Sequence, residues 1–364
     1  MCQHCAPTRR VMISVYLVHF FKVERGLVAC TGIDDLMQTL SINHNPLDWR
    51  LFIDSSQWSL KADLLHNGNT LPSIPVGHSV HNKESYENMK ILMEVINYDK
   101  FKWKICGDLK AIALLLGLQQ GFTKHCCFFC EWDSRARYLH YSKKVWPARK
   151  SMEPGIMNVE NQPIVEPSKI LLPSMHLKLG MMKNFVKAMN QEEAAFTYLR
   201  EKFHSLSEEK LKGDIFVGPQ IRDLIKDKYF DRLTQGDEKE AWDSFEFIIK
   251  EFLGNRSAQN YEELVNRILQ SYQKISCNLS LKIHFLHSHL DFPRRIMVQW
   301  VMNTDNVSIK AFLQWRRDIK GNGTVLCSPT TAGLWQGMPL PWNTSDRQNE
   351  KKKVILFVLN NELT

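Results

Sequence analysis

Four residues in two short patterns have the side chains and spacing of a metal site. Cys127 and Cys130 are separated by two phenylalanines, a spacing that suits two thiolates on one zinc ion. His284 and His289, five residues apart, would complete a tetrahedral Cys₂His₂ shell. The alternative is that the cysteine pair is ordinary core and the histidines form a solvated helix face. The spacing therefore indicates a zinc site without excluding a purely structural role.

A third histidine makes the assignment of the histidine pair ambiguous. His287 lies between the other two and shares a helical face with His284 more readily than His289 does. Pairing His284 with His289 therefore requires the helix to end near Leu286.

Two aspartates suggest a different metal chemistry. Asp54 ends the first strand of a predicted sheet, and Asp108 follows the fourth strand, directly after Gly107. Carboxylates at adjacent strand ends suit Mg²⁺ or Mn²⁺, and paired divalent ions stabilise both the attacking and the leaving oxygen in phosphoryl transfer. The alternative is that Asp54 begins a turn and Asp108 is the N-cap of the next helix.

The elements that would position these residues follow from the hydrophobic pattern. The first part predicts, in order, strands at Trp49–Asp54, Leu60–His66 and Ser73–Ser79, a helix at Lys83–Asn97, a strand at Phe101–Cys106 and a helix at Leu109–Leu118. The later part predicts helices at His176–Met189, Pro219–Asp227, Lys239–Leu253, Tyr261–Lys274 and Ser280–Leu290. This order predicts an α/β core followed by an all-α block.

The same pattern divides the chain into four parts. Residues 1–45 are expected to be an N-terminal remnant, and 46–150 an α/β core that includes the Cys-x-x-Cys knuckle. Residues 151–292 are expected to be a mainly helical insertion that ends in the histidine cluster. Residues 293–364 show neither helical nor alternating periodicity and are expected to be an irregular tail.

Composition narrows the functional classes. An apolar fraction of 44% is enough for a full core, and no apolar run is long enough for a membrane span. Charged residues soon interrupt the apolar stretch from Val11 to Phe21, so we expect a nuclear or cytoplasmic protein rather than a secreted one. The net charge is +8, but the 71 residues after Pro293 hold ten Lys or Arg against five acids. Bulk charge therefore gives weak support for DNA binding.

Longer motifs carry a resemblance to a known family. Residues 51–56 (LFIDSS), 64–69 (LLHNGN) and 105–110 (ICGDLK) resemble reading frames of animal mobile elements. Over roughly residues 30 to 292, the order of features is similar to that of DDE-type cut-and-paste transposases of the CACTA, Chapaev and Transib kind.

This resemblance implies a ribonuclease H-like core interrupted by a helical insertion, with DNA as partner and a possible homodimer. It implies that Asp54 and Asp108 are the first two catalytic acids, which would bind Mg²⁺ or Mn²⁺ in a competent enzyme. It also implies that the two cysteines of the knuckle and the pair His284 and His289 hold zinc.

The third acid of such an enzyme is missing. Where a Glu-His-Gly sequence is expected after Phe292, the chain has Val301–Val307. Synonymous codons for this stretch can encode Asp-Glu-His-Gly-Gln-Arg in the neighbouring frame, which suggests a frameshift near Pro293 or Arg294. Asp63, inside an otherwise apolar strand, is a further sign of decay unless it faces solvent at a sheet edge.

Several functions therefore remain open. The leading expectation is a degenerate, catalytically inactive relative of DDE transposases, related to DNA by descent. A second is a zinc-braced, non-enzymatic module that binds DNA or protein. An active, metal-dependent DNA strand transferase is a third, and a decayed gene product without selected function is a fourth.

Overall fold

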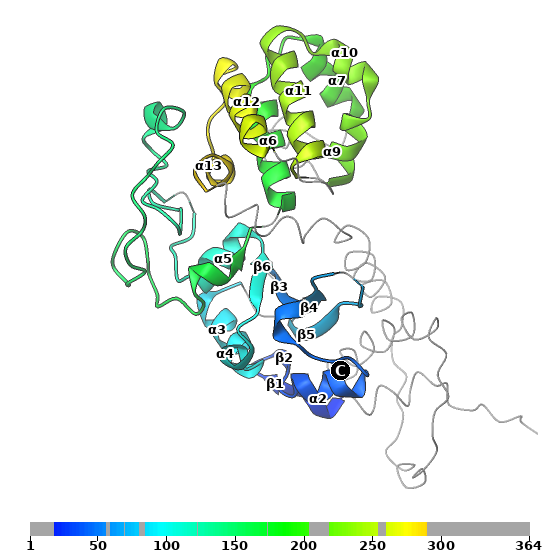
Figure 1. The fold of residues 1–364 in the computed structure, drawn as a ribbon, viewed down its shortest axis with the longest axis vertical. Helices are drawn as coiled ribbons and strands as arrows, with labels where there is room; N and C mark the ends of the chain where they lie inside the picture. The colour runs from blue at the N-terminus through cyan, green and yellow to red at the C-terminus, as the bar shows by residue number, and fades with distance from the viewer. Residues whose placement is uncertain are drawn as a thin grey trace, which may run out of the picture. The chain divides into compact units, whose positions relative to one another are not determined.

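The computed structural model describes eight stretches of the chain: residues 18–55, 59–68, 70–79, 84–121, 123–172, 174–203, 218–253 and 260–289. Within them the protein is mixed α/β, with one seven-stranded sheet and eleven α-helices (Figure 1). They fall into two compact units, divided between Lys104 and Ile105. The predicted tail, 293–364, lies outside the described residues.

The first unit contains the predicted meander and an additional hairpin. Its strands are β1 (Phe21–Glu24), β2 (Leu27–Cys30), β3 (Trp49–Ser55), β4 (Leu60–His66) and β5 (Ile74–Ser79). Consecutive strands from β3 to β5 pair antiparallel, as the sequence predicts. The β1–β2 hairpin turns at Arg25-Gly26, both with positive φ, and β2 pairs with β5. Part of the predicted N-terminal remnant is therefore integral to the sheet.

Two further strands complete the sheet order β1-β2-β5-β4-β3-β6-β7. They are β6 (Lys104–Gly107) and β7 (Ile170–Leu171), which pair parallel. The strand predicted at Phe101–Cys106 begins later than expected, because the short helix α4 (Tyr98–Phe101) takes its first residue.

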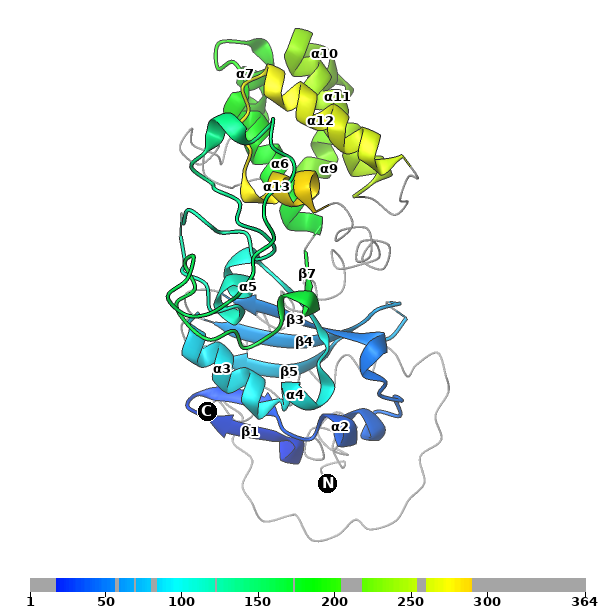
Figure 2. The same ribbon diagram turned by 60° about the vertical axis from the view of Figure 1, so that its left-hand side comes forward.

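One face of the meander is apolar and carries a helix in close contact. Helix α3 (Tyr86–Val95) is capped by the Ser85 hydroxyl, which accepts a hydrogen bond from the backbone N–H of Asn88. A Cβ added to Gly77 of β5 would lie 2.6 Å from Leu92 Cδ1, so the glycine is what lets α3 approach the strand (Figure 2). Helix α2 (Ile33–Thr39) also belongs to this unit and buries its apolar residues.

The opposite face of the meander carries charged residues and corrects one expectation. Asp63 is on β4, which lies between β3 and β5, so it is not at a sheet edge. Its side chain is half-buried, and desolvation raises its pKa to about 6, with Lys61 opposing and Asp54 reinforcing the shift. The sheet therefore holds a desolvated carboxylate.

The second unit is mostly helical. After α5 (Leu109–Leu115), a long segment with little regular structure leads to β7. The helices that follow are α6 (Ser174–Ala188), α7 (Ala194–Lys202), α9 (Gly218–Ile225), α10 (Lys228–Leu233), α11 (Gly236–Glu251), α12 (Tyr261–Lys274) and α13 (Leu281–Ser288). All five predicted helices of this block are present, and α12 has the predicted bounds. None of the helices in the described stretches has the length and apolarity required to cross a membrane.

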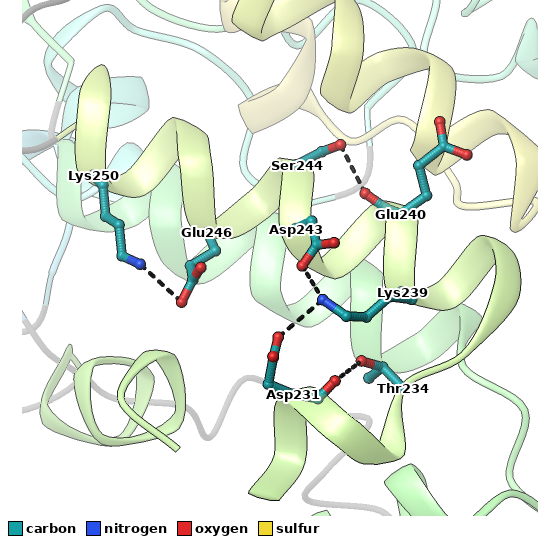
Figure 3. Close-up of polar contacts among 8 residues, drawn as sticks. All are labelled: Asp231, Thr234, Lys239, Glu240, Asp243, Ser244, Glu246 and Lys250. Atoms are coloured by element: carbon teal, nitrogen blue, oxygen red, sulfur yellow. Dashed lines mark hydrogen bonds and ion pairs between the residues drawn. The ribbon is translucent and has the colours of Figure 1, made fainter. Parts of the chain in front are cut away.

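Helix α11 shows how this helical part arranges its surface charges (Figure 3). Lys239 forms ion pairs with Asp243 on the same helix and with Asp231 of α10. Further along α11, Lys250 Nζ lies 3.0 Å from Glu246 Oε1. Lysines on this surface are therefore neutralised locally, mostly by partners one helical turn away.

A small residue brings α13 close to α6. A Cβ added to Gly180 of α6 would lie 2.9 Å from Cβ and 2.2 Å from Cδ of Lys282 on α13. Any side chain at position 180 would therefore require Lys282 of α13, the helix that carries the histidine cluster, to shift.

Candidate metal centre

The knuckle with Cys127 and Cys130 is held in shape by main-chain contacts with a later segment. Cys130 forms an antiparallel bridge with Ala148, and the backbone N–H of Glu131 donates to the Pro147 carbonyl at 2.8 Å. The guanidinium of Arg149 donates to the carbonyls of Cys127 (3.2 Å), His125 (2.7 Å) and Met157 (3.1 Å). The two thiols therefore come from a braced turn.

The histidine pair reaches the knuckle from α13 and from the residue that follows it. The helix continues to Ser288, two residues beyond the end that the sequence analysis required. His289 is the C-cap, with φ of −130° and ψ of 42°, so the backbone leaves the helix at the second predicted ligand. This change of direction lets His289 join His284 despite the five-residue spacing.

The four predicted ligand atoms lie close together. Both histidine Nε2 atoms are 3.3 Å from Cys130 Sγ, and His289 Nε2 is 3.5 Å from Cys127 Sγ. The four possible ligand atoms all lie within 4.8 Å of one another. His287 is buried but does not belong to the cluster. The described part of the chain thus contains one Cys₂His₂ group that could hold a metal ion.

The protonation states of the cluster are strongly coupled. The pKa of Cys130 is lowered, first by the hydrogen bond from the Cys127 thiol, and then by His284 and His289. Burial raises the pKa of Cys127 and lowers that of His284. One thiolate beside one thiol is the arrangement expected of the metal-free pair. A bound cation would displace the remaining thiol proton.

Aromatic rings enclose the centre and fix the His284 ring. Trp132 stacks on His284, with ring centroids 4.6 Å apart and planes inclined by 11°, and also contacts His140. Phe129 packs against His289 at 5.1 Å between centroids. Among the described residues, no group accepts a hydrogen bond at His284 Nδ1. The stack with Trp132 therefore orients this ring, where many metal-binding histidines use a second hydrogen bond.

Asp54 and Asp108, the two predicted catalytic acids, lie in different structural environments. Asp108 caps α5, and its Oδ1 accepts from the Ala111 backbone N–H at 2.6 Å. This matches the capping alternative of the sequence analysis. Asp54 is the second-last residue of β3, and its pKa is raised by desolvation and by nearby Glu84, against the opposing charge of Lys61. Within the described residues, neither acid belongs to a group of three or more possible metal ligands. Their catalytic role stays a prediction.

Sequence reasoning missed the residues that support the centre. No sequence spacing marks Arg149 or Trp132 as part of the site. Arg149 donates to carbonyls that folding brings together, and Trp132 stacks on the His284 ring of α13. Three other acids, Glu131, Asp133 and Asp291, could be asked to replace the missing third carboxylate. Glu131 and Asp133 lie beside the knuckle, and Asp133 pairs with Lys124 at 3.4 Å. A third such residue, Asp291, lies outside the described residues.

Comparison with known proteins finds two family models. Residues 13–165 match a domain of unknown function (DUF8703), and residues 174–254 match a second domain of unknown function (DUF8704). No curated protein matches the chain. No solved structure matches it either. The chain is thus similar to two families of unknown function, one spanning the knuckle and one within the helical part.

Proposed function

We propose that Cys127, Cys130, His284 and His289 bind one structural zinc ion. In a tetrahedral site with Zn–S of about 2.3 Å and Zn–N of about 2.0 Å, a sulfur and a nitrogen ligand lie about 3.5 Å apart. Three of the four separations between sulfur and nitrogen, 3.3, 3.3 and 3.5 Å, are close to this value, and the fourth is within 4.8 Å. This agreement is the observation that carries the proposal.

The ligand set favours a structural over a catalytic ion. Four protein ligands fill a tetrahedral shell, whereas catalytic zinc keeps a position open for water or substrate. The ion would join the knuckle to the end of α13, which lies more than 150 residues further along the chain. Closing so long a loop makes metal binding a contribution to folding.

For the chain as a whole, we propose a zinc-braced, non-enzymatic binding module descended from a DDE transposase. The antiparallel meander and the helical block that follows it support this proposal, because the resemblance implies an α/β core interrupted by a helical insertion. The knuckle and histidine pair have the positions the resemblance gives them. The capping role of Asp108 supports an inactive protein, because this carboxylate already has a structural function.

Metal analysis of the purified full chain tests the zinc proposal. We expect one zinc ion per chain, and replacement by Co²⁺ should give the visible absorption of a tetrahedral site with thiolate ligands. The variant Cys127→Ser/Cys130→Ser should lose the metal. Cys126→Ser is the matched control, because this half-buried thiol is adjacent to the knuckle but outside the cluster, and it should keep the metal. Wild-type protein without zinc, or a double variant that retains it, would contradict the proposal.

A further inference from the structure

One buried nitrogen of the metal centre lacks the partner that its chemistry requires. His284 is fully buried, and its Nε2 lies 3.3 Å from Cys130 Sγ. When Nε2 binds a metal ion, the neutral ring carries its proton on Nδ1, which is then a hydrogen-bond donor. Among the described residues, none accepts from this atom. Since a buried donor without an acceptor destabilises a folded protein, an acceptor is expected close to the ring.

A hydroxyl at the start of the same helical turn also lacks a partner. Ser280 Oγ is shielded from solvent and forms no hydrogen bond with any described residue. The turn between the two residues is closed, because the backbone N–H of His284 donates to the Ser280 carbonyl at 2.8 Å. Side chains of an α-helix lean toward its N-terminus, so the His284 ring lies over the turn that begins at Ser280. The unpartnered donor and the unpartnered acceptor are therefore adjacent on α13.

The Ser280 hydroxyl is available because it does not cap the helix. Ser280 is the N-cap of α13, where a serine hydroxyl normally accepts from a backbone N–H of the first turn. Ser85, at the same position of α3, accepts from the backbone N–H of Asn88 at 3.3 Å. The Ser280 side chain makes no such bond. It can therefore serve another donor without loss of a helix cap.

Other groups beside the His284 ring are less suitable acceptors. The indole of Trp132, which stacks on the ring, can only donate. Ser288 follows His284 by four positions, and its Oγ is likewise buried without a partner among the described residues. Because the ring leans away from Ser288, toward the N-terminus of the helix, we expect no hydrogen bond between them. Ser288 is thus a matched control for Ser280.

We propose that Ser280 is a positioning residue of the metal centre, whose hydroxyl accepts a hydrogen bond from His284 Nδ1 when Nε2 binds zinc. Rotation about the Cα–Cβ bond of Ser280, from one staggered rotamer to another, redirects its oxygen toward the ring. The hydrogen bond fixes the tautomer and orientation of the imidazole and makes Nε2 a stronger ligand. The inference rests on the proposed function, because it concerns how one ligand of that zinc ion is held.

Competition titration of the full chain with zinc and a chromogenic chelator tests the proposal. Ser280→Ala should weaken zinc binding by about tenfold, the lower end of the usual effect of losing such a contact. Ser280→Thr keeps the hydroxyl and should bind zinc like the wild type, as should Ser288→Ala. Unchanged affinity in Ser280→Ala, equal losses in Ser280→Ala and Ser288→Ala, or a loss that threonine does not restore would overturn the proposal.

A further variant separates positioning from helix capping. Glycine is nearly as good as serine at an N-cap but has no hydroxyl. Ser280→Gly should therefore weaken zinc binding about as much as Ser280→Ala. Affinity like that of the wild type in Ser280→Gly would show that the alanine variant acts through the helix end, and would overturn the role of the hydroxyl.

Nuclear magnetic resonance of the zinc-loaded protein, labelled with ¹⁵N in histidine, detects the hydrogen bond itself. A buried and hydrogen-bonded Nδ1 proton exchanges slowly with water and should give a resolved signal. This signal should persist in Ser280→Thr and shift or disappear in Ser280→Ala. A spectrum that is identical in wild type and Ser280→Ala would contradict the proposed contact.

These outcomes are separable from those of the zinc proposal. A wild type that binds zinc, together with Ser280→Ala of equal affinity, refutes the role of Ser280 and leaves the metal centre in place. A wild type without zinc refutes both.

Discussion

The metal centre and the charged face of the meander both enclose ionisable side chains, but their charges are arranged differently. At the centre, two thiols and two imidazoles place their ligand atoms within 4.8 Å of one another. On the meander, desolvation and Asp54 raise the pKa of Asp63, desolvation and Glu84 raise the pKa of Asp54, and Lys61 only partly opposes both shifts. A bound cation would stabilise the first arrangement, whereas desolvation of the carboxylates destabilises the second. Enclosure of titratable groups by itself therefore does not identify a functional site.

The largest effect is expected on zinc affinity, when removal of a proposed ligand is compared with removal of a histidine beside it. His289→Ala removes one of four ligands and should weaken zinc binding by more than about 100-fold, beyond the usual effect of losing a supporting contact. His287→Ala is the control, because this buried histidine lies outside the cluster. It should leave zinc affinity unchanged, even though a cavity lowers stability. Competition titration with a chromogenic chelator measures both, and an equal loss in the two variants would reject the assignment of His289.

A smaller effect, on stability, is expected from changing Asp63 on the meander. The pKa of Asp63 is about 6 in the folded chain against an ordinary value of 3.8, so ionisation destabilises the fold as pH rises from about 4 to about 6. Asp63→Asn should therefore stabilise the protein by about 2 kcal/mol at pH 7 and by little below pH 4. Urea unfolding at both pH values measures this. Glu94→Gln, at an exposed position of α3, should change stability by less than about 0.5 kcal/mol. A destabilised Asp63→Asn would show that the carboxylate has a favourable partner.

The smallest effect concerns Asp108. If the carboxylate serves as the N-cap of α5, Asp108→Ala should lose about 1 kcal/mol, and Asp108→Ser should retain most of the stability because serine also caps helices. Thermal unfolding compares the three proteins. A nicking assay on supercoiled DNA with Mg²⁺ or Mn²⁺ examines the catalytic alternative. Activity in the wild type that disappears in both Asp108→Ser and Asp54→Ala would contradict the inactive protein we propose.

Regular elements with strong periodicity were predictable from the sequence. The meander strands and α12 need only local alternation or helical spacing, and their predicted bounds agree with the structure to within one residue. Short elements were not predictable, because β1, β2 and α10 are four to six residues long and give no periodic signal. The turn at Arg25-Gly26 was the available clue to the hairpin.

The candidate site shows the same limit. Cysteine and histidine in paired spacing have few roles, so the cluster of Cys127, Cys130, His284 and His289 followed from residue type. Aspartate has many roles, and capping is a common one, so Asp108 could not be assigned from spacing.

The close contact between Gly180 and Lys282 has a consequence for how codon 180 evolves. Every single-nucleotide change of a glycine codon that alters the amino acid introduces a Cβ atom, and here each would require Lys282 of α13 to shift. Codon 180 is thus a reporter of selection on the proposed metal centre, although it encodes none of the four candidate ligands. Gene copies under selection to keep the centre should retain glycine there, and copies drifting without selection should lose it as readily as any neutral codon.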